Sequence, residues 1–252
     1  MTVLAGKTVL VTGAGQGIGQ GVAIAMAKEG AAIAVVEINA ATAAETVAQI
    51  RATGGQAVAI PCDVRDAMQV RAAVTATVSA FGRLDILVNN AHATRAGIPL
   101  HKVSAEDLAL SMESGFYATW HMMQAAFPHL CREGGKIINF GSGAGLNGAW
   151  GQSAYAASKE AIRGISRVAA TEWARHGINV NVICPAAESP GVRKWKEELP
   201  NQYRATLKMI ALGRYGDCER DIGRAAVFLA SPDADFITGQ TLMVDGGCVF
   251  VR

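Results

Sequence analysis

Short apolar and β-branched runs alternate along the chain with longer stretches in which apolar residues recur at helical spacing. The short runs predict buried parallel strands, and the longer stretches predict helices. Because strands and helices alternate throughout, right-handed crossovers would produce one parallel sheet with helices on both faces, an α/β fold of the doubly wound Rossmann type. The predicted strands cover residues 8–11, 31–36, 57–60, 86–88, 136–140 and 179–183, and the predicted helices cover residues 22–27, 40–53, 67–81, 105–131, 153–175 and 218–230.

The alternation continues through all 252 residues, a length sufficient for one large domain with a substantial core. No linker, repeat or low-complexity segment divides it, so we expect a single domain over residues 1–252. The stretch 186–212 breaks the pattern because it is charged and irregular. We expect this stretch to form a lid over a substrate site, since loops that carry specificity vary on a constant scaffold.

Composition and charge exclude several classes of function. The chain is 50% hydrophobic and 17% charged, which is typical of a globular enzyme and not of a disordered protein. Its formal net charge of +2 provides no basic field for nucleic acid. No apolar run approaches the roughly 20 residues that span a bilayer, and the N-terminus lacks the layout of a signal peptide, so no membrane partner is expected. The five cysteines are scattered without metal-ligand spacing, which indicates free thiols in the cytoplasm and no metal site.

A glycine-rich loop, Thr-Gly-Ala-Gly-Gln-Gly-Ile-Gly, directly follows the first predicted strand and precedes a predicted helix. Glycines permit a tight turn there and allow backbone N–H groups to approach a pyrophosphate at the helix N-terminus. A plain β–α turn would need one glycine and not four. The order of strand, loop and helix therefore predicts a dinucleotide site. The expected contacts are Gly13, Gln16, Gly17, Ile18 and Gly19.

The next predicted strand ends in Glu37, eighteen residues after Gly19. This separation is close to the ~20 residues expected for the carboxylate that binds an adenosine ribose. A carboxylate accepts a hydrogen bond from the 2′-hydroxyl and repels a 2′-phosphate. No Arg or Lys follows at Ile38 or Asn39, so NAD is favoured over NADP. Without the glycine loop, Glu37 would be interpreted as a solvated residue at a strand end.

Tyr155 and Lys159 are four residues apart in a segment rich in helix formers, so they share one helix face. An unperturbed phenol has a pKa of about 10, and a nearby ammonium favours its charged form. Ser142 precedes Tyr155 by thirteen residues and follows the predicted strand at 136–140. The Ser142 hydroxyl is therefore expected at the carboxyl edge of the sheet, where such folds bind ligands. The Tyr/Lys pair alone is common on surface helices, so its interpretation depends on the remaining chain.

Together these motifs resemble the short-chain dehydrogenase/reductase family over nearly the whole chain. The resemblance implies that Tyr155 is the general acid/base, that Ser142 orients the substrate oxygen, and that Lys159 binds the nicotinamide ribose and lowers the pKa of Tyr155. The resemblance also implies cofactor contacts beyond those of the glycine loop, Glu37, Tyr155 and Lys159. These are Asp63, Val64, Asn89, Ala91, Pro185 and Glu188.

The chain departs from the family pattern at three positions. His92 replaces a usual glycine, either as a solvated loop residue or as a polar group beside the pocket. The position of a usual catalytic asparagine falls on Gly115, which has no side chain to hold a water in the proton relay, so Ser114 or a water would have to substitute. Glu188 stands where an apolar residue often contacts the nicotinamide, and its carboxylate would point to water or bind a polar substrate group.

The substrate is expected to be a medium-sized cyclic or aromatic secondary alcohol or ketone. The candidate contacts are His92, Ser142, Asn147, Trp150 and Trp195. Two other activities remain open: a low-turnover dinucleotide-binding protein that senses cofactor or scaffolds a partner, and a dehydratase or epimerase on the same fold. The resemblance and the apolar tail at residues 248–251 indicate a homotetramer.

Overall fold

The computed structural model describes residues 2–250 of the chain. These residues form a seven-stranded sheet with the order β3-β2-β1-β4-β5-β6-β7, in which all neighbouring strands are parallel. The Rossmann-type doubly wound sheet predicted from the sequence is therefore confirmed, and β7 adds a strand that the sequence did not predict. The strands are β1 (Thr8–Thr12), β2 (Ala32–Glu37), β3 (Gln56–Pro61), β4 (Ile86–Asn89), β5 (Gly135–Phe140), β6 (Ile178–Pro185) and β7 (Thr241–Val244).

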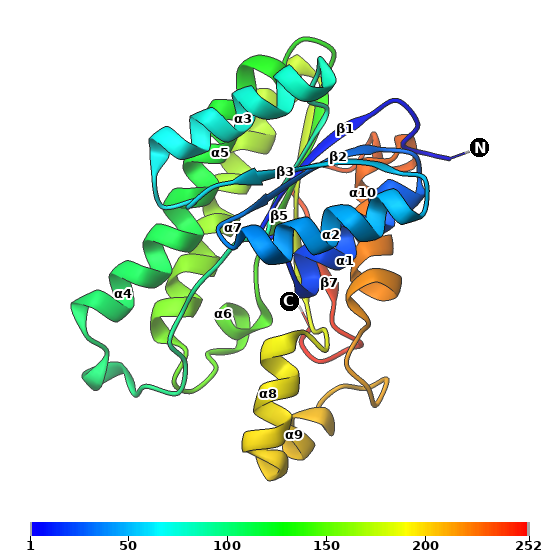
Figure 1. Cartoon of the computed structure of the whole chain (residues 1–252). Helices are drawn as coiled ribbons and strands as arrows, with labels where there is room; N and C mark the ends of the chain where they lie inside the picture. The colour runs from blue at the N-terminus through cyan, green and yellow to red at the C-terminus, as the bar shows by residue number, and fades with distance from the viewer. Residues whose placement is uncertain (1, 251–252) are drawn as a thin grey trace.

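Helices cover both faces of the sheet (Figure 1). Successive strand residues point to opposite faces, so Val9 and Val11 pack into one apolar core and Leu10 into the other. Both faces are buried, which explains why the strands are continuous apolar runs. One face is covered by α1 (Gly17–Lys28), α2 (Ala40–Ala52) and α10 (Arg224–Ala230), and the other by α3 (Ala67–Phe81), α5 (Ala118–Leu130) and α7 (Ser153–Trp173).

The long helix predicted at 105–131 is interrupted. It divides into α4 (Ala105–Ser111), a π-helical segment (Met112–Tyr117) and α5. Within the π segment, the Ser114 hydroxyl lies 2.6 Å from the Leu110 carbonyl oxygen, and Gly115 has a low helix propensity. Such π segments frequently occur at functional sites. A second one (Cys218–Gly223) precedes α10.

The stretch predicted as an irregular lid contains two short helices, α8 (Pro190–Glu198) and α9 (Pro200–Leu207). The Ser189 side chain caps α8, and Pro190 stands at its first turn, where a proline is tolerated. Both helices lie beyond the carboxyl edge of the sheet, at the bottom of Figure 1. Another short helix, α6 (Gly143–Asn147), follows β5. None of the helices within residues 2–250 has both the length and the apolarity needed to cross a bilayer.

Candidate active site

A crevice of about 580 Å³ opens at the carboxyl ends of β1 and β4. The chain order of the strands reverses between these two strands, and parallel sheets bind ligands at such points. The crevice thus brings together the glycine loop, the end of β2 and helix α7. Predicted site residues in its lining are Gly13, Gln16, Ile18, Glu37, Asp63, Val64, Ala91, His92 and Tyr155.

The glycine loop has the close packing that a pyrophosphate cradle requires. Gly13 and Gly17 adopt φ values of +63° and +59°, which favour glycine. A Cβ at Gly19 would overlap the Gly13 carbonyl oxygen. The first turn of α1 therefore lies directly against the loop, and its N-terminus opens into the crevice.

Thr12 and Asn90 fix this loop to the end of β4, and neither was singled out from the sequence. The Thr12 hydroxyl accepts hydrogen bonds from the backbone N–H groups of Asn90 and Ala91, both at 3.0 Å. The Asn90 amide donates to the carbonyl oxygens of Thr12 at 3.0 Å and Gly13 at 3.1 Å. The sequence did contain a signal for this clamp, because a polar residue stands at the end of each of two neighbouring strands.

Asn89, in contrast, directs its side chain into the core. Its amide donates to Asn139 Oδ1 at 2.8 Å, and Asn139 donates in turn to Ser166 Oγ at 2.9 Å. The side chain thus joins a buried polar chain between β4, β5 and α7. Any contribution of Asn89 to cofactor binding would come from its backbone.

Glu37 is held in place at one end of the crevice. Its carboxylate accepts hydrogen bonds from the backbone N–H groups of Gly15 at 3.1 Å and Ile38 at 2.9 Å. It is therefore oriented toward the glycine loop, where a ribose hydroxyl would fit. Nearby, the Arg65 guanidinium pairs with Asp63 through contacts as short as 2.6 Å and holds the pKa of that carboxyl below its usual value. The positive charge of Arg65 is thus already paired.

The three residues predicted to be catalytic lie close together between β5 and α7, and of the three Tyr155 lines the crevice. Lys159 is buried, and its Nζ donates to the Phe140 carbonyl oxygen at 2.9 Å. Ser142 caps α6 by accepting a hydrogen bond from Ala144 N at 3.1 Å, and it is close enough to Tyr155 to lower the pKa of the phenol. The structure therefore brings these three side chains together, as the sequence predicted.

The expected direction of the Tyr155 pKa is reversed in the structure. Burial raises the pKa of Tyr155 and outweighs the opposing effect of Ser142. Burial also lowers the pKa of Lys159 to about 8. The expectation from the sequence considered the charge of Lys159 but not the loss of water around both groups, which disfavours each charged form. Tyr155 is therefore a neutral phenol at neutral pH.

His92 is half-buried beside Tyr155, with its Nδ1 atom fully buried, and is not a solvated loop residue. The two ring centroids are 5.0 Å apart, and His92 Nε2 lies 2.9 Å from Ser111 Oγ. Burial, with a smaller effect from the charge of Lys159, lowers the pKa of His92 to about 2. The imidazole is thus a neutral polar group in the wall of the crevice.

At the other two departures from the family pattern, Ser114 beside Gly115 and the Glu188 carboxylate both interact with neighbouring groups. Ser114 Oγ accepts a hydrogen bond from Ala93 N at 2.9 Å and thereby joins the π segment to the loop after β4. The Glu188 carboxylate pairs with Lys196 at 3.3 Å on the lid. Pro185 ends β6.

Four of the five predicted substrate residues, Ser142 among them, do not line the crevice. Trp150 is 76% exposed, and Asn147 is also exposed. Trp195 packs edge-on against Tyr203, with ring centroids 5.7 Å apart, inside the lid. A role for these residues would depend on how the lid and α6 meet a bound substrate.

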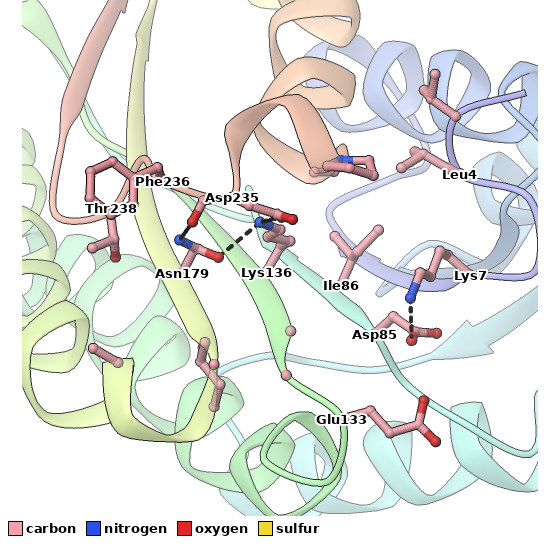
Figure 2. A pocket seen from close by; sticks show the side chains of 18 residues that line it. Leu4, Lys7, Asp85, Ile86, Glu133, Lys136, Asn179, Asp235, Phe236 and Thr238 are labelled. Carbon is pink, nitrogen blue, oxygen red and sulfur yellow. Dashed lines mark hydrogen bonds and ion pairs between the residues drawn. The ribbon is translucent and has the colours of Figure 1, made fainter.

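A larger cavity of about 720 Å³ lies at the opposite, amino edge of the sheet. Figure 2 shows Lys136 beside Asp235 and Asn179, with Nζ–oxygen distances of 2.6 and 2.8 Å. These contacts join β5 and β6 to the loop before β7, so we interpret them as structural. Across residues 2–250, no cluster of His, Cys, Asp or Glu side chains is arranged to hold a metal ion.

Known proteins resemble this chain over nearly its whole length. Residues 13–249 match a family model described as enoyl-(acyl carrier protein) reductase. A 12alpha-hydroxysteroid dehydrogenase from a Clostridium species is 41% identical over 98% of each chain. A 2,5-dichloro-2,5-cyclohexadiene-1,4-diol dehydrogenase from Sphingobium indicum is 35% identical, also over 98% of each. The crystal structure of a dehydrogenase/reductase from Sinorhizobium meliloti aligns with a TM-score of 0.90 and 37% identity, over 99% of this chain and 97% of that one.

Proposed function

The chain belongs to the short-chain dehydrogenase/reductase family, and on this premise we propose that it is an NAD(H)-dependent oxidoreductase of secondary alcohols and ketones. One observation carries the proposal: the Glu37 carboxylate and the Tyr155 phenol line the same crevice. In this proposal Glu37 binds the adenosine ribose and Tyr155 faces the reacting oxygen. A nicotinamide cofactor bound there would supply or accept the hydride.

The crevice is suited to such a cofactor. The glycine loop offers backbone N–H groups at the start of α1, and the packing at Gly19 leaves room for nothing larger than hydrogen on that residue. Glu37 would accept a hydrogen bond from the ribose 2′-hydroxyl, which favours NAD over NADP. Further cofactor contacts are proposed for Gln16, Gly17, Ile18, Asp63, Val64, Asn89, Ala91, Pro185 and Glu188.

Tyr155 would exchange the proton. As a neutral phenol it donates to the oxygen of a ketone, and as a phenolate it accepts the proton of an alcohol. Ser142 would hold the substrate oxygen by a hydrogen bond. Lys159 would stabilise the phenolate as it forms, because its ammonium lies over the ring.

We propose a medium-sized cyclic or aromatic substrate. Two relatives are named for hydroxyl groups on ring compounds, a 12alpha-hydroxysteroid and a cyclohexadiene diol. The exposed Trp150 in the segment after α6 and the aromatic packing of Trp195 in the lid would favour a flat apolar ring over a charged chain.

The test is Tyr155→Phe, assayed with a panel of cyclic secondary alcohols by the absorbance of reduced cofactor. We expect turnover to fall by at least ~10²-fold, as general acid–base catalysis predicts, while NAD binding is retained. Unchanged turnover would reject the role of Tyr155. Tight NAD binding without turnover of any alcohol or ketone by the parent protein would favour the alternative of a dinucleotide-binding sensor or scaffold.

We also propose a homotetramer in the cytoplasm. Exposed aromatic side chains lie along the π segment and α5, including Tyr117 at 49% and Trp120 at 42% exposure. Such side chains are common in subunit contacts. The five cysteines are free thiols, as expected in a reducing compartment. A light-scattering mass equal to one chain would reject the tetramer.

A further inference from the structure

Within residues 2–250, six buried side-chain atoms have no hydrogen-bond partner, and two of them lie next to Gly115. These two are His92 Nδ1 and Ser158 Oγ. A buried polar group without a partner has lost its bonds to water without replacing them, so such groups call for an explanation. The two atoms belong to different parts of the chain, the loop after β4 and helix α7.

Gly115 lies beside both of these atoms. A Cβ added to Gly115 would lie 3.1 Å from His92 Nδ1 and 2.9 Å from His92 Cε1, and it would overlap Ser158 Oγ. Both atoms therefore face the same small space, which is open only because residue 115 has no side chain. The φ of Gly115 is not positive, so backbone conformation does not require glycine here.

The hydrogen-bonding chemistry of the two groups is complementary. A neutral imidazole has one donor and one acceptor nitrogen, and a serine hydroxyl can donate or accept. When Nε2–H donates to Ser111 Oγ, Nδ1 is left as the acceptor for the Ser158 hydroxyl. Ser158 is next to Lys159 and three residues from Tyr155 on α7, and the His92 ring already contacts the Tyr155 ring.

We propose that His92 and Ser158 are linked by a hydrogen bond across Gly115, directly or through one water, and that this link holds the Tyr155 ring in its reacting position. The inference rests on the proposed role of Tyr155 in proton transfer. His92 is then a positioning residue, and Gly115 is required because any side chain there would separate the linked groups.

The link itself can be tested without a substrate, by ¹⁵N NMR of the imidazole rings. The protein has five histidines, and His92→Asn identifies the His92 signals by their loss. We expect a neutral ring with the proton on Nε2, and a change in the Nδ1 shift in Ser158→Ala. The control is Thr77→Ala, which removes another buried hydroxyl, one bonded only to its own helix. An Nδ1 shift in Ser158→Ala equal to that in the parent and in Thr77→Ala would overturn the link.

The positioning role is tested by two replacements of His92. Asparagine places an amide near Nδ1, and glutamine places one near Nε2. We expect Ser158→Ala, Gly115→Ala and His92→Gln each to lower kcat roughly tenfold, the equivalent of one hydrogen bond, while His92→Asn retains most of it. The double variant His92→Gln/Ser158→Ala should be no slower than either single variant. NAD affinity, measured by fluorescence titration, should remain that of the parent and shows that each variant is folded.

The kinetic outcomes distinguish this inference from the proposed function. Full turnover in Tyr155→Phe would reject the proposed function, but the NMR measurement would still report on the link. If Tyr155→Phe is impaired and Ser158→Ala keeps full kcat, the positioning role is rejected and the proposed function stands. Additive losses in the double variant would also reject the link, because independent groups add.

Discussion

The Nζ atom of Lys159 lies over the face of the Tyr155 ring, 5.6 Å from its centroid. The ammonium is held there by the Phe140 carbonyl at the end of β5, and both side chains are shielded from water. Burial consequently opposes both charged forms and leaves a neutral phenol beside an ammonium whose pKa is about 8. This balance determines how the chemistry should respond to pH.

Alcohol oxidation should accelerate as the pH rises, because it requires the phenolate. The pKa of Tyr155 is raised, so the phenolate population should grow about tenfold per pH unit through the neutral range. Ketone reduction uses the neutral phenol and should be nearly independent of pH there. Measurement of kcat/KM in both directions between about pH 6 and about pH 8, where Lys159 keeps its ammonium, checks this. An oxidation rate that is flat over that range would contradict it.

The half-buried imidazole of His92 should make the fold sensitive to acid. Its pKa is lowered from 6.5 to about 2 in the folded chain, so between these values the unfolded state binds more protons. The free energy of unfolding should therefore fall as the pH drops below 6.5, with a slope approaching about 1.4 kcal/mol per pH unit. Urea unfolding at several pH values should show a shallower slope for His92→Asn. The same change at the exposed His101 is the control and should keep the parent slope.

Removal of the Glu37 charge should reduce the preference for NAD. Glu37→Gln keeps one acceptor oxygen, enough for either the Gly15 or the Ile38 N–H group, and no longer repels a 2′-phosphate. The ratio of kcat/KM for NAD to that for NADP should fall by roughly tenfold or more, the effect of about 1.4 kcal/mol. Glu45→Gln removes a charge from an exposed position of α2 and should leave the ratio unchanged. A parent protein that prefers NADP would show that Glu37 has been misinterpreted.

A methyl group in the glycine loop should weaken both folding and cofactor binding. The Cβ of Gly19→Ala would overlap the Gly13 carbonyl, so the loop has to shift, at a cost of about 1–3 kcal/mol in stability. Gly164→Ala is the matched control, because a Cβ at that position of α7 meets no atom within 4 Å. That variant should be as stable as the parent or more stable by up to ~1 kcal/mol. Thermal unfolding with and without NAD measures both effects, and an unshifted melting temperature in Gly19→Ala would contradict the packing argument.

Much of the fold could be predicted from local pattern. Runs such as that of β1 are apolar on both faces, and the stretch of α3 has helical spacing between Asp66, which caps it, and Gly82, which ends it. The break in the helix at 105–131 could not be predicted in this way. It depends on bonds of Ser114 to Leu110 within the helix and to Ala93 in another loop, and only folding brings the second contact about.

The sequence by itself determined the order of strands and helices, the glycine loop, and the spacing that places Tyr155 above Lys159, because each depends on residues close together in the chain. The tertiary structure decided the direction of the Tyr155 pKa, the burial of His92, the inward direction of Asn89 and the space at Gly115. These properties depend on which distant segments exclude water from a side chain or offer it a partner, and such contacts leave no periodic trace in the sequence.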